Sequence, residues 1–584
     1  MLCYMADHLT LYHERLDDVP VIIGLANKLG LAPLLNQHLG THASQQGLDN
    51  GRLTVGWLGY ILSQADHRKS VVQEWAQGLT VTLSQLLDQP LRAVDFCDDR
   101  LGRLLRRFSD DTAWEGIEES LWRASVTVYA LPPLTGVRLD STSSYGYHQP
   151  QPAGWMQYGH SKDHRPDLSQ LKLMAAAAEP SGQLLASDVV AGQAADDPLY
   201  RPLLARVRQI VGQEGVLYSG DCKMAALDTR ADIVSHHDFY LTPLPLTGET
   251  ARAFATWVDA IVDGTQEATL VWEGAQLLGA GYEFVRPQAA TLKDASGVTQ
   301  EVAWQERVLV MRSRALAQAQ QSTLNQHLAA AQAALERLTP PPARGKRQFR
   351  DEASLQSAIA AITERLDVVG LVEVTWEREE TTVTHYRGRG RGGPQRATAT
   401  ETQVRYVIQG VQVNAAALAA RQYRLGWRVQ VTNAPVTRLG LAAAVVHYRG
   451  GWVLERDFHL VKDLPLGLSP LFVWKDDQIK GLVRLLTLGL RLLTLLENQV
   501  REGLAQEAAT LRGVYPGHAA RETARPTAKR LLELFVRAQL TLTRVAWQDS
   551  TQWSLTPLSA LHQQILRYLR LPASLYAALI PNSS

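Results

Sequence analysis

The sequence predicts an α/β protein built on a mixed β-sheet, with helical regions at both ends of the chain. Residues 1–130 carry apolar side chains at a spacing of about 3.6 residues, which is typical of amphipathic helices. From about residue 134 the pattern changes to strands and helices in the order β-β-β-α-β-α-β. Three strands in succession, followed by alternating helices and strands, imply a mixed sheet with helices packed on its faces.

The first part of the sheet lies in residues 131–246. It opens with GVRLD and continues with two strand-like runs, LKLMAAAA and LLASDVVAG, which the turn-like EPSGQ separates. A helix follows, whose predicted apolar stripe is Leu199, Leu203, Val207 and Ile210. GVLYSGD then indicates a strand, MAALDTRADIVSHH a helix, and FYLTPLP the last strand of this part.

An insertion at residues 247–440 interrupts the sheet. It contains strand-like pieces and a helical hairpin, at about 313–338 and 351–369. Two of its loops are basic, the first with Arg344, Lys346, Arg347 and Arg350, and the second with Arg387, Arg389, Arg391 and Arg396. Flexible basic loops suit sequence-tolerant contacts with phosphate, although an exposed linker has the same composition.

Charge and composition restrict the partners. The net charge is only +1, so any site for a polyanion must be a local patch. Cys3, Cys97 and Cys222 are too few and too far apart for a disulfide framework or a common zinc site, which suits a reducing cytosol. The start of the chain lacks the pattern of a signal peptide, and Arg484 and Arg491 interrupt the longest apolar run. We therefore expect a cytosolic protein without membrane contact, in which that run is a buried helix.

Two strand-like segments end in an aspartate, VRLD at Asp140 and LYSGD at Asp221. In open sheets with crossover connections, functional groups gather at the carboxyl ends of the strands. If the two strands are neighbours, the carboxylates lie side by side and repel each other unless a cation lies between them. Hard oxygen ligands of this kind suit Mg²⁺ or Mn²⁺.

A third carboxylate is expected from a helix packed beside the aspartates. In YRGGWVLERDFHLVKD the helical spacing predicts an apolar stripe of Leu454, Phe458 and Val461. The adjacent stripe is Glu455, His459 and Lys462. One face of this helix can therefore offer a metal-binding carboxylate and, two turns later, a phosphate-binding ammonium group.

With these segments the chain resembles the DDE transposases of bacterial insertion sequences, in the branch marked by a Tyr-Arg-Glu-Lys signature. LDSTSSYGYH and VLYSGDCKMA match the two aspartate segments, and YGHSKDHRPDLSQ resembles the family's GYSKDHRPDLPQ hairpin. The signature spacing is Tyr, two residues, Arg, three residues, Glu, six residues, Lys. Tyr448, Glu455 and Lys462 fit it, whereas Gly451 stands at the arginine position. The resemblance covers about residues 20–570.

The resemblance implies an RNase H-like catalytic core, whose second part is residues 441–505 and is followed by a helical region at 506–584. It implies that Asp140, Asp221 and Glu455 are catalytic and hold two Mg²⁺ or Mn²⁺ ions about 4 Å apart. The expected partners are double-stranded DNA, as terminal inverted repeats and target, and a second copy of the chain in the DNA complex. Residues 1–130 are expected to bind DNA. Further DNA contacts are expected from Tyr448, Arg449, Lys462, Lys162, Arg165, Arg387, Arg389 and Arg391.

Two alternatives remain open at this stage. An RNase H-like nuclease that cuts without joining uses the same carboxylates. A catalytically inactive DNA-binding derivative, acting as a repressor, would explain Gly451. For an active enzyme we expect the Glu455 helix to begin near Trp452, with Tyr448 and Arg449 in the preceding loop. Arg449 would then replace the missing arginine, and Gly451→Arg would compensate for its loss.

Overall fold

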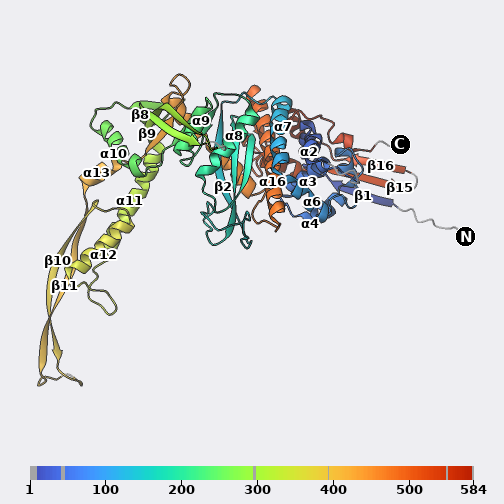
Figure 1. Cartoon of the computed structure of the whole chain (residues 1–584). Helices are drawn as coiled ribbons and strands as arrows, with labels where there is room; N and C mark the ends of the chain where they lie inside the picture. Colours follow the sequence, from blue (N-terminus) through green and yellow to red (C-terminus); the bar gives the residue numbers. More distant parts are fainter. Residues whose placement is uncertain (1–8, 41–45, 294–296, 392, 548–549, 582–584) are drawn as a thin grey trace.

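The structure is a computed structural model that describes residues 9–40, 46–293, 297–391, 393–547 and 550–581, so Cys3 lies outside it. Its centre is a nine-stranded mixed sheet in the order β4-β3-β2-β5-β6-β12-β9-β8-β7. Figure 1 shows the N-terminal helices on one side of this sheet and a long arm projecting from the other.

Five strands form an RNase H-like core. They are β2 (Gly136–Gly146), β3 (Ser169–Glu179), β4 (Leu184–Ala191), β5 (Leu217–Ser219) and β6 (Phe239–Pro243). β3 is antiparallel to its neighbours β2 and β4, whereas β5 runs parallel to β2 and β6 runs parallel to β5. A short 3₁₀ helix, η1 (Asp197–Leu199), and α8 (Tyr200–Val211) connect β4 to β5, and α9 (Leu227–Ser235) connects β5 to β6. The predicted fold class and strand order are confirmed.

Alternate side chains of β3 enter two different cores, because successive residues of a strand point to opposite faces of the sheet. One set packs with the N-terminal helices and α16 (Asp476–Gln506), and consists of Leu171, Leu173, Ala175 and Ala177. The other set packs with α8 and consists of Met174, Ala176 and Ala178. The sheet is therefore covered on both faces, which explains why β3 is a nearly continuous apolar run.

The N-terminal helices, α16 and the C-terminal helices share one hydrophobic core. The N-terminal set is α1 (Val19–Leu29), α2 (Leu31–Leu39), α3 (Asn50–Gln64), α4 (Lys69–Gln77), α5 (Thr80–Leu86), α6 (Asp98–Phe108) and α7 (Asp111–Tyr129). The C-terminal set is α17 (Ala528–Arg537), α18 (Ala560–Tyr568) and the 3₁₀ helix η2 (Ala577–Leu579). The apolar run at Arg484 and Arg491 lies in α16 and is buried, as predicted.

The two ends of the chain also contain strands, where the sequence predicts mainly helices. β1 (Leu9–Arg15) pairs along its whole length with β15 (Thr541–Trp547), which in turn pairs with β16 (Ser550–Leu555). A second pair, β13 (Leu511–Arg512) and β14 (Glu522–Thr523), is very short. The expectation of an all-helical N-terminal region is wrong here because β1 is stabilised by a partner near the other end of the chain, which local periodicity does not reveal.

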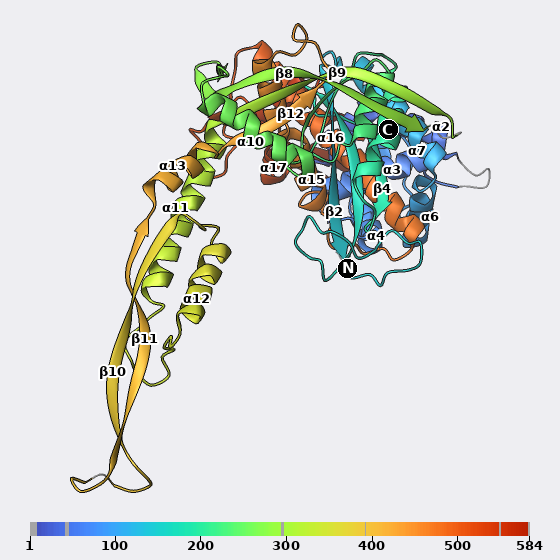
Figure 2. The ribbon, with the colours of Figure 1, turned by 60° about the vertical axis from the view of Figure 1, so that its left-hand side comes forward.

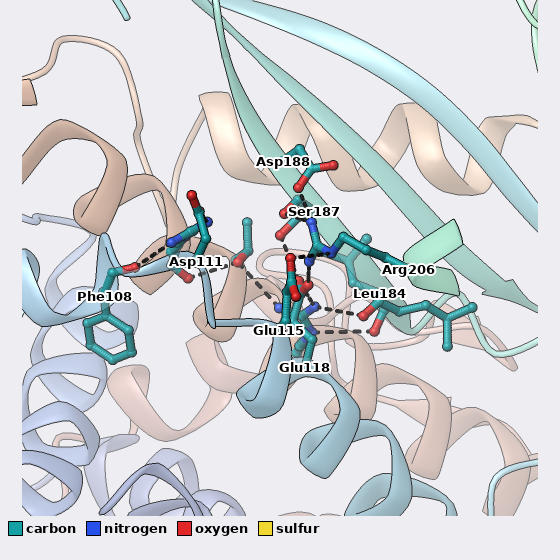
Figure 3. A network of polar contacts seen from close by, with 12 residues as sticks. Phe108, Asp111, Glu115, Glu118, Leu184, Ser187, Asp188 and Arg206 are labelled. Carbon is teal, nitrogen blue, oxygen red and sulfur yellow. Dashed lines mark hydrogen bonds and ion pairs between the residues drawn. The ribbon is translucent and has the colours of Figure 1, made fainter. Parts of the chain in front are cut away.

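A buried ionic network joins the N-terminal helices to the sheet (Figure 3). Glu118 of α7 is fully buried and pairs with Arg206 of α8 and with Arg491 of α16, the latter at 2.7 Å. Ser187 of β4 donates a hydrogen bond of 2.9 Å to the same carboxylate, and Arg206 also pairs with Asp188. A buried carboxylate that lost its partners would cost several kcal/mol, so this network fixes how α7, α8, β4 and α16 meet.

Four strands of the predicted insertion extend the core sheet. They are β7 (Thr269–Glu273), β8 (Gln276–Lys293), β9 (Thr299–Ser313) and β12 (Trp427–Thr432), and α10 (Gly248–Val262) precedes them. β12 pairs with β6 on one side and β9 on the other. The sheet is thus continuous across the boundary drawn at residue 246 from the sequence.

The remaining elements of the insertion form the arm seen in Figures 1 and 2. They are α11 (Arg314–Glu336), α12 (Glu352–Arg365), β10 (Val372–Tyr386), β11 (Thr398–Val413) and α13 (Ala415–Tyr423), which agrees with the predicted helical hairpin. A small core that includes Leu324, Leu328 and Leu371 holds the base of the arm together. β10 and β11 form a two-stranded sheet and continue away from this core as a ribbon.

Two short helices, α14 (Leu441–Arg449) and α15 (Trp452–Lys462), return the chain from the arm to the core. Gly450 and Gly451 separate them. Within the described residues no single helix is long and apolar enough to span a membrane, although α1 and α2, bent by 61° at their junction, reach the required length and composition together.

Candidate active site

Asp140 and Asp221 lie on neighbouring strands of the core. β2 and β5 pair in parallel, with Val137 opposite Tyr218 and Arg138 opposite Ser219. Two residues further along both chains, the same register brings Asp140 beside Asp221. The charge of Asp221 contributes to raising the pKa of Asp140, which is consistent with this proximity. The structure therefore brings these two sequence-predicted residues together.

Burial is the largest influence on Asp140 and raises the pKa of its carboxyl group above the ordinary value. Two donors oppose this effect. The Lys162 ammonium lies 3.4 Å from Oδ1, and the Ser141 backbone N–H donates to the same oxygen at 2.7 Å. Lys162 also donates to the Ser141 carbonyl at 2.5 Å and to its hydroxyl at 2.8 Å. Lys162, from the loop between β2 and β3, is thus a counterion held directly over the aspartate.

Asp221 is oriented by a tyrosine that the sequence analysis missed. The Tyr200 hydroxyl donates to Asp221 Oδ1 at 2.7 Å, and the Lys223 N–H donates to the same oxygen at 2.9 Å. Burial, and then the charges of Asp221 and Asp140, raise the pKa of Tyr200 well above its ordinary value. Tyr200 therefore stays protonated and acts as a fixed donor. Tyr200 is the first residue of α8. The segment DDPL directly before it marks the start of a helix, and this signal in the sequence could have drawn attention to Tyr200.

A further carboxylate, Asp196, lies beside these residues and was also missed. Ser141 Oγ lies 3.2 Å from Asp196 Oδ2, and the Lys172 ammonium lies 2.7 Å from Oδ1. Burial acts to raise the pKa of Asp196, but the hydrogen bond and charge of Lys172, with a contribution from Lys162, lower it below the ordinary value. Asp196 is therefore an ionised partner of the two lysines.

Helix α15 runs along β2. At its start, the guanidinium of Arg138 on β2 lies against Gly451, and at its end Lys462 pairs with Asp163 at 2.6 Å, next to Lys162. Its predicted apolar stripe, Leu454, Phe458 and Val461, is buried. Glu455 is exposed, one helical turn after Gly451.

Asp221 lies just after the end of β5, as expected, but β2 continues to Gly146, so Asp140 lies within its strand and not at the end. The two carboxylates fit a divalent cation, since hard oxygen ligands repel each other less when a cation lies between them. The assembly is incomplete, however. Among the described residues, no three Asp, Glu, His or Cys side chains come close enough together to hold a metal ion. The structure therefore brings together Asp140 and Asp221, but it does not bring Glu455 into a three-carboxylate cluster with them.

Tyr448 and Arg449 lie in the last turn of α14 rather than in a loop, which corrects the expectation from the sequence. Helix α14 extends to Arg449, and only Gly450 and Gly451 separate it from α15. Tyr448 is partly buried and packs against an apolar cluster that includes Leu217 and Leu241. Burial, followed by the charge of Asp221, raises the pKa of Tyr448 to about 12. Arg449 lies 3.5 Å from Glu273 of β7, and both side chains are about half exposed.

A cavity of about 660 Å³ opens beside Tyr448. Its polar lining includes Arg449, Arg314 of α11 and Arg428 of β12, and its apolar lining includes Leu278 and Met311. The cavity thus lies between α14 and the start of α11 at the base of the arm, and its three arginines make it basic.

The remaining predicted DNA contacts are distributed over two places. Arg165, in the loop between β2 and β3, pairs with Asp167 at 2.8 Å and lies over the Tyr145 ring. Arg387, Arg389 and Arg391 are exposed at the far end of the arm, away from the carboxylates (Figures 1 and 2). Arg396 has a different role, because it donates to the backbone carbonyls of Arg387, Gly388, Gly390 and Arg391 and so shapes the turn.

The chain was compared with family models, curated proteins and solved structures. The family model described as "Transposase DDE domain" matches residues 132–488. No curated protein matches the chain significantly. Among solved structures, the chain is similar to the cryo-EM structure of piggyBac transposase in a synaptic complex with hairpin DNA, at 10% sequence identity and a TM-score of 0.24. That match covers 50% of this chain and 63% of the other, so the chain spans less than two thirds of that protein's length.

Proposed function

The chain belongs to the family defined by the transposase DDE domain, and from this premise we propose that it cuts and joins the ends of an insertion sequence by metal-dependent phosphoryl transfer. The observation that carries the proposal is the pairing of β2 with β5, which sets Asp140 beside Asp221 at the centre of an RNase H-like sheet. The terminal inverted repeats and the target would be double-stranded DNA. Because strand transfer joins two ends, we expect two copies of the chain in the DNA complex, which would act in the cytosol.

Asp140, Asp221 and Glu455 are the residues that would hold Mg²⁺ or Mn²⁺, with two ions expected. Bound divalent ions lower the pKa of an attacking water or 3′-hydroxyl and stabilise charge on the leaving 3′-oxygen. Glu455 must then move towards the aspartates, and α15 can carry it as a unit, since the glycine pair before Trp452 leaves a break in the helix.

The residues around the aspartates have separate tasks. Tyr200 fixes one oxygen of Asp221 by its hydrogen bond, so that the other oxygen stays directed into the site. Lys162 balances the charge of Asp140 and is near enough to pass to a DNA phosphate. Tyr448, Arg449 and Lys462 flank the site as further phosphate contacts, and Arg165 and the N-terminal helices would hold flanking DNA. Positioning and charge of this kind are most of what phosphoryl transfer requires from a protein.

Substitution of each carboxylate tests the proposal. Asp140→Asn, Asp221→Asn and Glu455→Gln should each abolish Mg²⁺-dependent cleavage of DNA that carries the inverted repeats flanking the coding region, while binding of the same DNA is largely retained. Asp228→Asn is the matched control, because Asp228 is an exposed aspartate in the first turn of α9. An Asp221→Asn protein that cuts at the wild-type rate would contradict the assignment.

A DNA-binding derivative that no longer cuts is the second candidate. It is favoured by Gly451 at the signature arginine position and by the exposed position of Glu455. Wild-type protein that binds the repeats specifically, yet leaves them intact in Mg²⁺ and in Mn²⁺, would support this candidate over the first.

A further inference from the structure

Exposed cations without an acidic partner gather in two clusters on the arm. The first, here called the elbow cluster, is Arg344, Lys346, Arg347 and Arg350 in the connection between α11 and α12. The second, the tip cluster, is Arg387, Arg389 and Arg391. All seven side chains are exposed, and within the described part of the chain none of them pairs with a carboxylate.

The cations of the ribbon between the two clusters, unlike those of the clusters, are paired with carboxylates. Arg378 is matched by Glu380 at 2.5 Å and Arg405 by Glu379 at 3.8 Å. His385 lies 3.8 Å from Glu401 in the same way. The two strands of the ribbon carry five glutamates and two arginines, so their net charge is negative. An approaching polyanion is therefore attracted at the elbow and at the tip but not between them.

The elbow cluster is fixed against the ribbon at a defined level. Phe349 forms a β-bridge with Tyr406 of β11, and Thr339 Oγ1 accepts from the Ile408 N–H at 3.0 Å. Arg347 lies over the Phe349 ring, 4.7 Å from its centre. In Figure 2 the connection between α11 and α12 lies beside the middle of the ribbon, and the turn between β10 and β11 lies well beyond it.

The spacing of the clusters follows from the register of the ribbon. Tyr406 pairs with Arg378, and the last pair before the turn is Tyr386 with Thr398. Eight residues separate Tyr406 from Thr398 (406 − 398 = 8), which span about 27 Å at about 3.4 Å per residue. The turn adds a few ångström, so the clusters lie about 30 Å apart. One turn of B-form DNA spans about 34–36 Å.

We propose that one DNA duplex lies along the arm and is held by its phosphates at two points about one helical turn apart, at the elbow cluster and at the tip cluster. Phosphates separated by one turn lie on the same side of the duplex, so both clusters reach the backbone without the ribbon entering a groove. This contact rests on the proposed function, in that it takes DNA to be the substrate. It adds a grip on DNA outside the cleavage site that holds the backbone and is indifferent to base sequence.

The first test measures the salt dependence of binding to a 30-bp duplex of arbitrary sequence by fluorescence anisotropy. Replacing Arg387, Arg389 and Arg391 by Ala should lower the slope of log affinity against log salt by up to about 2.7, at about 0.9 per phosphate contact. Replacing Arg344, Arg347 and Arg350 by Ala should lower it by a similar amount. Arg378→Ala removes an exposed arginine of the same ribbon that already has a partner, and it should leave the slope unchanged.

The second test changes the distance between the clusters. Four residues inserted after Thr382 and four before Thr402, which face each other, lengthen the ribbon by about 14 Å and keep every side chain on its original face. The clusters are then about 44 Å apart, well beyond one turn of the duplex. The tip then moves by about four base pairs, or about 140° around the duplex. The slope should fall to that of the tip variant, and the insertion should have no further effect when the tip arginines are already Ala.

Three results would overturn the proposal: an unchanged slope in either alanine variant, wild-type binding by the lengthened ribbon, or equal losses with a 30-nucleotide single strand. A wild-type chain that binds no duplex at all is a different failure, since it removes the proposed function. Limited proteolysis of each variant verifies that the ribbon has kept its structure.

Discussion

The guanidinium of Arg138 occupies the space beside Gly451, so that a β carbon added at Gly451 would lie 3.3 Å from Arg138 Nη1. Arg138 is held there by Glu179, whose Oε1 accepts from Nε at 2.7 Å, and by the His447 carbonyl, also at 2.7 Å. Arg138 of β2 thus lies beside position 451, where the Tyr-Arg-Glu-Lys signature has an arginine.

This relationship changes what Gly451→Arg is expected to do. A second guanidinium at this place must displace the first and meets a like charge, so we expect a lower melting temperature and slower cleavage rather than compensation. Gly451→Ala adds only a methyl group against the end of a side chain, and its effect should be much smaller. Thermal unfolding and single-turnover cleavage measure both. Faster cleavage by Gly451→Arg would show that the site accepts an arginine from the helix.

Tyr200→Phe tests the orientation of Asp221. It removes a hydrogen bond to a carboxylate, worth about 1.5–3 kcal/mol, and should slow cleavage by roughly tenfold to a hundredfold. The Mg²⁺ concentration for half-maximal cleavage should also rise. Tyr60→Phe is the matched control, since Tyr60 donates a similar bond of 2.7 Å to Asp66 in α3 and its neighbouring loop. Equal Mg²⁺ dependence in wild type and Tyr200→Phe would exclude an orienting role.

Asp163→Asn tests whether Lys462 is available to DNA. The side chains of Lys462 and Asp163 are only 19% and 18% exposed, so Lys462 can bind a phosphate only by leaving Asp163. The substitution weakens the pair and should raise the salt slope of DNA binding by about 0.9, the value for one added phosphate contact. Asp163→Asn combined with Lys462→Gln should lose this gain. If the double variant binds like the single one, Lys462 only fastens α15 to the loop.

Asp18 makes the stability of the N-terminal helices depend on pH. Burial, with a contribution from the charge of Asp17, raises the pKa of Asp18 from 3.8 to about 7, although Ser63 donates a hydrogen bond to it at 2.7 Å. The folded state therefore holds this proton more tightly than the unfolded state. Stability from this group is complete below about pH 4 and is lost as the pH rises through 7.

Asp18→Asn should abolish that loss. The melting temperature of the variant minus that of wild type should increase from pH 4 to pH 7 and then remain constant. Asp49→Asn is the control, because hydrogen bonds with Arg52 and Asn36 outweigh burial and lower the pKa of Asp49. The pH dependence of that group lies below about pH 4, so the difference between Asp49→Asn and wild type should stay level from pH 4 to pH 7. A constant difference between Asp18→Asn and wild type across this range would contradict the assignment.

Features encoded by local pattern were predictable from the sequence. The strand order from β2 to β6 follows from alternation and turn residues, and the stripe of Leu454, Phe458 and Val461 follows from helical spacing. Asp140 and Asp221 could be singled out because each follows a short strand-like segment, although β2 in fact continues past Asp140. These observations need no knowledge of distant contacts.

Features that depend on packing were not predictable in this way. Tyr200 and Arg138 owe their roles to neighbours on other elements, and nothing in their local sequence specifies those neighbours. β12 joins β6 although the whole arm lies between them in the sequence, so the insertion could not be recognised as part of the main sheet. The same holds for the exposed position of Glu455, which the spacing of α15 alone does not determine.

The pairing of β1 with β15 has a consequence for synthesis on the ribosome. Arg15 pairs with Thr541, so almost the whole chain must be translated before β1 can find its partner. At about 5–20 residues per second this takes about 25–105 s. During that time the edge of β1 is open to other chains, including nascent copies on the same messenger RNA. The N-terminal helices can pack together early, but the pairing of β1 with β15 is among the last steps in the folding of the molecule.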